Sequence, residues 1–136
     1  MNEEIKTDKN TEVVYKLNKL TADNKIRWRF DEEDPILKDD EDNFDLSYIT
    51  NYKDKLLRLS SKTEKSYRTQ LLLFGPKKPR PKLVYVKRVY LEMITDNYKS
   101  IYKFDASNES LEDLLETVKI QSSGALDLID DILSSE

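Results

Sequence analysis

The chain has 136 residues, of which 37% are charged, and its formal net charge is -4. This length suits a single domain with one hydrophobic core, and the charged fraction, above the usual ~25%, predicts a heavily charged surface. Cysteine and histidine are both absent, which excludes cysteine nucleophiles, imidazole bases, disulfides and zinc sites of the usual ligand types.

The charges are strongly segregated along the chain. Lys and Arg number 1 against 9 Asp and Glu in residues 31–45, 14 against 4 in residues 46–104, and 1 against 9 in residues 105–136. A basic middle is therefore bracketed by two acidic blocks. Such segregation bears on the choice of partners rather than on the fold.

The N-terminal residues 1–10 are polar and carry no apolar periodicity, so we expect a mobile end followed by a single domain over residues 11–134. Nothing there has the apolar core of a signal peptide, and no run approaches the ~18 apolar residues of a membrane span. We expect a cytoplasmic protein without a membrane segment. Val13, Leu17 and Leu20 then predict a short amphipathic helix over residues 11–21.

The next segment, KIRWRF, alternates strictly between apolar and basic residues, which predicts a half-buried strand over residues 25–30. The apolar face consists of Ile26, Trp28 and Phe30. The acidic run DEEDPILKDDEDNFD, residues 31–45, follows as an expected solvent-exposed loop broken by Pro35. Ile36, Leu37 and Phe44 are its candidate anchors to the body.

The middle of the chain predicts four more strands and then a short fifth. LSYITNY and KLLRLSS flank Lys53-Asp54 as a hairpin, and SYRTQLLLF forms a strand that ends at Gly75. The basic, proline-rich loop of residues 75–82 leads into LVYVKRVYLEMI, and the turn TDNYKS leads into IYKF. About six strands joined by short connections predict an antiparallel meander.

The C-terminal segment predicts two helices. Ser110 and Asp113 have the spacing of a capping box, and an apolar stripe follows at Leu111, Leu114, Leu115 and Val118. After SSG, a second helix carries an acidic outer face with Asp127, Asp130 and Asp131. The fold class is therefore α+β: a short N-terminal helix, a meander, and two C-terminal helices packed on one face of the sheet. We expect Ile26, Trp28 and Phe30 to pack against Leu114, Val118 and Ile129.

A resemblance to a recurring group of small prokaryotic α+β proteins is carried by four segments: YKLNKLTADNKIRW, YITNYKDKLLRLS, RVYLEMITDNYKSIYKF and LEDLLETVKIQSSGALDLIDDIL. Proteins of this group combine a helix, an antiparallel meander and a C-terminal acidic helix pair. The resemblance spans residues 13–133 and supports the fold, and it implies no activity.

The acidic run has three interpretations. A calcium loop of the EF-hand type needs a glycine at its sharp turn, which this run lacks, so that match fails. Magnesium held by two or three of the carboxylates is left as an alternative, but charge runs on loops are more often solvated, so we expect no metal site. The run could instead neutralise the basic middle of its own chain. As a partner-binding element it would act at long range on a basic protein surface through Asp39, Asp40, Glu41 and Asp42.

The basic middle suggests a second kind of partner. Its candidate phosphate-binding residues are Lys77, Lys78, Arg80, Lys82, Lys87 and Arg88. Tyr85 and Tyr90 lie between them, and such interleaving is typical of single-strand binders. The alternative is structural, because tyrosine is a favoured strand residue and lysine protects strand edges.

Catalytic patterns are absent from the sequence. Its two glycines cannot form either glycine-rich phosphate loop, and its serines have no histidine base. We therefore expect no enzyme and no cofactor. The sequence favours a small, acidic protein-interaction module, of the kind of an inhibitor or immunity-type factor from a prokaryote or phage, and nucleic-acid binding through the basic sheet and residues 75–82 is the alternative.

Overall fold

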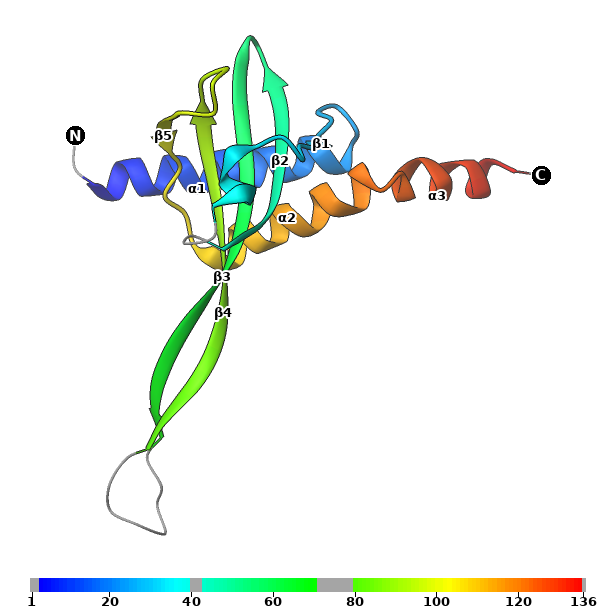
Figure 1. The fold of residues 1–136 in the computed structure, drawn as a ribbon. Coiled ribbons are helices and arrows are strands. Elements are labelled where there is room, and N and C mark those ends of the chain that lie inside the picture. Colours follow the sequence, from blue (N-terminus) through cyan, green and yellow to red (C-terminus); the bar gives the residue numbers. More distant parts are fainter. Residues whose placement is uncertain (1–2, 40–42, 71–79, 136) are drawn as a thin grey trace.

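The computed structural model describes residues 3–39, 43–70 and 80–135 and has the expected α+β class in a single domain (Figure 1). In chain order its elements are α1 (Glu3–Ala22), β1 (Arg29–Phe30), the 3-10 helix η1 (Pro35–Lys38), β2 (Phe44–Tyr52), β3 (Lys55–Gln70), β4 (Arg80–Ile94), β5 (Ser100–Lys103), α2 (Asn108–Ser122) and α3 (Ala125–Ser134). The described strands form one antiparallel sheet in the order β1-β2-β3-β4-β5, so the predicted meander is confirmed.

The sheet has five strands rather than about six, because two predicted strands are one. β3 runs without interruption through the polar residues between 61 and 66, since it pairs with β4 from Leu56↔Ile94 to Gln70↔Arg80. The basic loop is also shorter than expected, because Arg80, Pro81 and Lys82 already belong to β4. Proline is tolerated there because it lies near the start of the strand. Residues 71–79, with most of the predicted loop, lie outside the described residues.

The hairpin between β2 and β3 is confirmed at its turn. Lys53 and Asp54 have φ angles of 48° and 67°, the left-handed pair that matches the twist of two antiparallel strands. Three ladder pairs next to this turn are Thr50↔Leu57, Asn51↔Leu56 and Tyr52↔Lys55. The register places Leu57, Leu59 and Leu91 on the face that the helices cover.

The core lies between the sheet and the helices α1 and α2. Its buried residues are Val14, Leu17, Ile26, Trp28, Tyr48, Leu57, Leu59, Val89, Leu91, Leu111, Leu114, Leu115 and Val118. The expected packing of Ile26 and Trp28 in one core with Leu114 and Val118 is confirmed. The expectation was wrong for Phe30, which is 42% exposed, and for Ile129, which is 47% exposed.

Phe30 differs because the predicted strand 25–30 is only two residues long as β1, at the edge of the sheet. Its ring makes an edge-to-face contact with Tyr48, with 5.5 Å between the ring centroids. Residues 26–28 are held instead by Gln121 of α2, whose side chain accepts a hydrogen bond from the Trp28 backbone N–H at 2.9 Å and donates to the Ile26 carbonyl. The alternating pattern therefore predicted the burial of Ile26 and Trp28 correctly, but it was wrong for Phe30 and predicted the strand only in part.

Two helix starts also differ from the sequence expectation. α1 begins at Glu3 rather than at residue 11. Once the apolar residues from Val13 onward hold the helix against the core, lysine and glutamate can extend it toward the N-terminus, because both residues favour helix formation without being buried. The mobility of residues 1–10 stays a prediction. α2 begins at Asn108, and its N-cap is Ser107 instead of Ser110; the Ser107 hydroxyl accepts a hydrogen bond from the Ser110 N–H at 3.1 Å.

The helix α3 leaves the body after Gly124, whose φ of 82° ends the preceding helix (Figure 1). α2 packs on the sheet, whereas α3 has no buried residue. Within the described part of the chain, none of the helices combines the length and the apolar character needed to cross a membrane.

Candidate interaction surfaces

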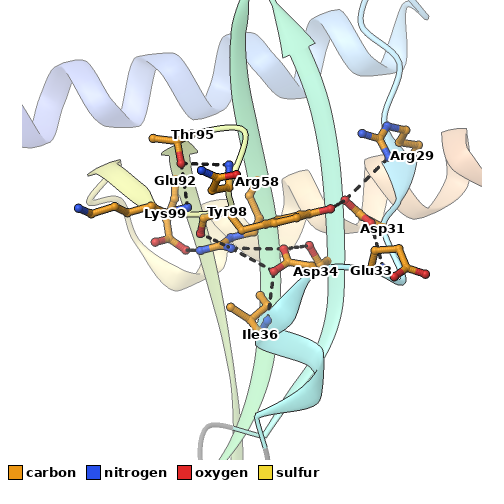
Figure 2. A network of polar contacts seen from close by, with 12 residues as sticks. Arg29, Asp31, Glu33, Asp34, Ile36, Arg58, Glu92, Thr95, Tyr98 and Lys99 are labelled. Carbon is orange, nitrogen blue, oxygen red and sulfur yellow. Dashed lines mark hydrogen bonds and ion pairs between the residues drawn. The ribbon is translucent and has the colours of Figure 1, made fainter.

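The first half of the acidic run folds back onto the sheet face opposite the helices. Asp31 and Asp34 are buried, with 5% and 0% exposure. Asp34 caps η1 by accepting from the Ile36 N–H at 3.1 Å, and its carboxylate also accepts from the Ser47 hydroxyl at 2.7 Å. The Arg58 guanidinium lies 3.2 Å from the same carboxylate (Figure 2). Burial of Asp34 is therefore compensated by a cation and two further donors.

Arg58 connects this contact to the rest of the sheet. Its other terminal nitrogen lies 3.2 Å from a carboxylate oxygen of Glu92 on β4, so one buried guanidinium lies between two carboxylates (Figure 2). Planar guanidinium groups suit such pairs because they present several donors in a fixed geometry. The expectation of a uniformly exposed acidic loop was therefore wrong for Asp34 and Asp31. The self-neutralising alternative is confirmed for Asp34, whose partner belongs to the basic middle.

Asp31 is held by the turn between β4 and β5. The Tyr98 phenol donates a hydrogen bond to the Asp31 carboxylate at 2.9 Å, and Arg29 lies 3.8 Å from the same carboxylate. The hydrogen bond to Asp31 raises the pKa of Tyr98 above its ordinary value of 10.0, and burial and the nearby negative charges of Asp31 and Asp34 raise it further. The contacts of Asp31 with Tyr98 therefore join the start of the acidic run to the turn between β4 and β5.

The second half of the acidic run contains the residues predicted to bind a partner. Asp39 follows η1 and is exposed, and Asp40, Glu41 and Asp42 lie outside the described residues. The predicted anchors Ile36, Leu37 and Phe44 are half-buried. In the described ranges, no group of three or more Asp and Glu residues converges as metal ligands do. Partner binding by this segment stays a prediction.

A two-stranded arm formed by the far parts of β3 and β4 leaves the body of the protein (Figure 1). β2 pairs with β3 as far as Lys62, and beyond it β3 and β4 pair only with each other, from Thr63↔Lys87 to Gln70↔Arg80. We call residues 63–70 and 80–87 the arm. With about 3.3 Å per residue, its eight paired positions extend roughly 25 Å.

The predicted nucleic-acid residues are only partly brought together by the arm. Lys82 and Lys87 are exposed on it, and Arg88 lies at its base, where its side chain is 3.6 Å from Glu64. The backbone of Arg80 belongs to β4, and Lys77 and Lys78 lie outside the described residues. The sequence prediction missed Lys65 and Tyr67, because it divided β3 into two strands. In the structure Lys65 pairs with Tyr85 and Tyr67 pairs with Leu83, so these four residues lie on one face of the arm.

The helix α3 presents the third surface. Leu128, Ile129, Ile132 and Leu133 are between 47% and 79% exposed. At 100° per residue these side chains share one face, and Asp127, Asp130 and Asp131 share the opposite face. The sequence indicated the amphipathic helix correctly, but it could not show that the apolar face lies outside the core.

The comparisons with known proteins found no match: no family model, no curated protein and no solved structure resembles this chain significantly.

Proposed function

We propose that the protein is a non-enzymatic interaction module that binds another protein through the apolar face of α3. The observation that supports this proposal most directly is the exposure of that face, whose four aliphatic residues are between 47% and 79% exposed, while no residue of α3 is buried. Four large aliphatic side chains lie together there, whereas single exposed apolar residues are ordinary on protein surfaces. Full burial of each would contribute about 1.5 to 3 kcal/mol to a complex.

The charge of α3 indicates the chemistry of the partner. The helix contains three aspartates and neither lysine nor arginine. An amphipathic helix of this kind fits an apolar groove on a protein, and basic residues at the rim of that groove would face the aspartates. The proposed partner is therefore a protein with a basic surface around an apolar groove. A protein that acts by such binding works stoichiometrically, as an inhibitor or immunity-type factor does.

The length of α3 supports the same proposal. A helix of 10 residues is marginally stable in water without tertiary packing, and α3 is held to the body by polar contacts of Asp127 with Asn24 at 3.1 Å and with Arg27 at 3.8 Å. Its apolar residues do not add to the core, so selection for folding does not explain them. Binding that buries the apolar face would stabilise the helix and the complex together.

Affinity capture from a lysate of the source organism tests this proposal when the wild-type bait is compared with two variants. The double variant Leu128→Ser/Ile132→Ser removes half of the exposed aliphatic side chains of α3. The control Ile101→Ser changes an aliphatic residue that is 57% exposed on β5. We expect a prey protein that binds the wild type and the control equally and is depleted at least tenfold with the double variant, because each substitution removes apolar area that the complex would bury.

Each outcome of the capture bears on the proposal. The prey is then purified, and its affinity for the wild type and the same variants is measured by calorimetry. A further variant, Asp130→Asn/Asp131→Asn, should lower the rate of association with the prey, mainly at low salt, and stopped-flow kinetics measure that rate. The proposal is wrong if every captured protein binds the double variant as well as the wild type. It is also wrong if sedimentation velocity shows a dimer that depends on Leu128 and Ile132, because the occupant is then a second copy of the chain.

A further inference from the structure

The arm has the charge of a polyanion-binding element, although the whole protein is acidic. Residues 62–88, which include the arm, contain nine Lys and Arg against one Glu, and the rest of the chain contains 14 against 26 Asp and Glu. Of these nine, five belong to the described strands of the arm, namely Lys65, Arg68, Arg80, Lys82 and Lys87, against the single Glu64. Charge on a structure that extends from the body acts on a partner with less opposition from the acidic surface behind it.

The two faces of the arm differ in exposure. Residues directly opposite each other in an antiparallel pair point to the same face, so the register assigns one face to Thr63, Lys65, Tyr67, Leu83, Tyr85 and Lys87. All six of these residues are exposed. On the other face, Glu64, Ser66, Val84 and Val86 are half-buried, and Lys82 is exposed. We call the exposed set the arm face.

The arm face alternates cations with aromatic rings. Lys65 lies directly opposite Tyr85, and Tyr67 is diagonal to Tyr85 in the same ladder. Tyr67 is 72% exposed and Tyr85 is 64% exposed. Lysines alone would be explained by the protection of strand edges, but two tyrosines with most of their surface exposed are not explained in that way. Exposed rings between cations fit a ligand that offers both negative charge and flat apolar surfaces.

A pair of like charges lies at the base of the arm face. Lys119 of α2 is near Lys87, and its pKa is lowered, first by burial and then by this neighbouring ammonium group. Two cations held near each other repel, and an anion placed between them would relieve the repulsion. The nearby Glu116 opposes part of this pKa shift, so the pair adds positive charge at the base of the arm face and is not by itself a phosphate site.

From the arm face we infer that the protein binds single-stranded nucleic acid, with Lys65 and Lys87 at phosphates and Tyr67 and Tyr85 stacked on unpaired bases. The unpaired bases of a single strand expose their flat faces, whereas those of a duplex are stacked on one another and cannot reach a tyrosine ring. The site is separate from α3, so this binding does not depend on the proposed protein partner.

Fluorescence anisotropy with a labelled oligo-dT strand of about 15 nucleotides, a length near the site size of single-strand binding domains, tests the inference on the full chain. We expect binding at about 50 mM salt that weakens as salt rises. Tyr67→Ala/Tyr85→Ala should weaken it roughly 5- to 100-fold for each stacked base. The matched control is Tyr15→Ala on α1, since Tyr15 is 74% exposed. Tyr67→Phe/Tyr85→Phe should keep the affinity because a phenyl ring still stacks.

The lysines are tested by the salt dependence. Lys65→Gln/Lys87→Gln should reduce the slope of log K against log salt by about 0.7 for each phosphate that is no longer neutralised, whereas the control Lys16→Gln/Lys25→Gln on the body should leave it unchanged. All variants change exposed residues and should keep the wild-type melting temperature. The inference is wrong if oligo-dT does not bind at low salt, if the tyrosine-to-alanine variant binds as the wild type does, or if a duplex of equal length binds more tightly than the single strand.

Discussion

Asp34 has no solvent exposure, although it belongs to a run of carboxylates that the sequence predicts to be solvated. Its neighbours in sequence do not distinguish it from Glu32 or Glu33. Its carboxylate is paired with the buried guanidinium of Arg58, which lies 24 residues away in sequence on β3. A buried pair of this kind depends on the register of the sheet, and periodicity in a single sequence carries no information on which charge meets which.

Removal of one partner from this network should be costly. Asp34→Ala leaves the Arg58 guanidinium buried with one carboxylate instead of two and leaves the Ser47 hydroxyl without its acceptor, so the free energy of unfolding should fall by about 3 to 5 kcal/mol. Urea denaturation measures the change. Glu33→Gln is the control, because the Glu33 side chain is 83% exposed, and it should change stability by less than about 0.5 kcal/mol. Equal effects of the two substitutions would contradict the role assigned to Asp34.

Trp28 was predicted from the sequence as a core residue, and the structure adds its polar contacts. Its indole N–H donates to the Thr21 hydroxyl at 3.0 Å, and its backbone N–H donates to Gln121. Trp28→Ala should lower the free energy of unfolding by about 3 to 5 kcal/mol through the cavity that it leaves. Phe30→Ala is the comparison from the same segment, and it should cost less because Phe30 is largely exposed. A Trp28→Ala variant as stable as the wild type would refute the packing.

Tyr98 predicts a pH effect on stability. Because its folded pKa is raised above 10.0, the protonated phenol contributes stability that is complete below about pH 10 and is lost as the pH rises through the folded pKa. The difference in unfolding free energy between the wild type and Tyr98→Phe should be constant from neutral pH to about pH 9 and should shrink above about pH 10. Denaturation at a series of pH values measures it. A difference that grows with alkaline pH has the wrong sign for this account.

At the scale of elements, the sequence predicted what depends on local pattern and missed what depends on distant partners. The Leu111, Leu114, Leu115 and Val118 stripe and the Lys53-Asp54 turn follow from spacing and turn chemistry, and both are confirmed. The continuity of β3 could not be predicted in this way, because its polar middle is held by its pairing with β4 rather than by burial. The exposed face of α3 was missed for a related reason, since an amphipathic pattern does not say what covers it.

α3 should be dispensable for the stability of the body. Deletion of residues 125–136 removes no buried residue among those that the structure describes. Its contacts to Asn24 and Arg27 are polar and lie at the surface. The free energy of unfolding of the remaining chain should therefore change by less than about 1 kcal/mol, as expected for exposed charge pairs. Thermal denaturation of the truncated chain measures this, and a large loss of stability would show that α3 belongs to the core.

At the scale of the whole molecule, the opposite charges lie on different structures. The basic arm extends in one direction from the body, and the acidic helix α3 extends in another (Figure 1). The sequence predicted the segregation as blocks along the chain, and it could not show that the two blocks project from the body as separate surfaces. Under the two proposals made above, this arrangement would place the polyanion and the basic protein partner on separate surfaces of one chain.

Hydrogen exchange tests the central claim most directly, because it reports whether α3 is covered. In the free protein, backbone amides of residues 125–134 should exchange near the rate of a fraying helix, while those of α2 should be protected as strongly as the core. With the captured partner bound, the amides of α3 should become protected and those of the arm should not. Amides of α3 that are as protected as those of α2 in the free monomer, or that stay unprotected in the complex, would contradict the proposal that this helix is the docking element.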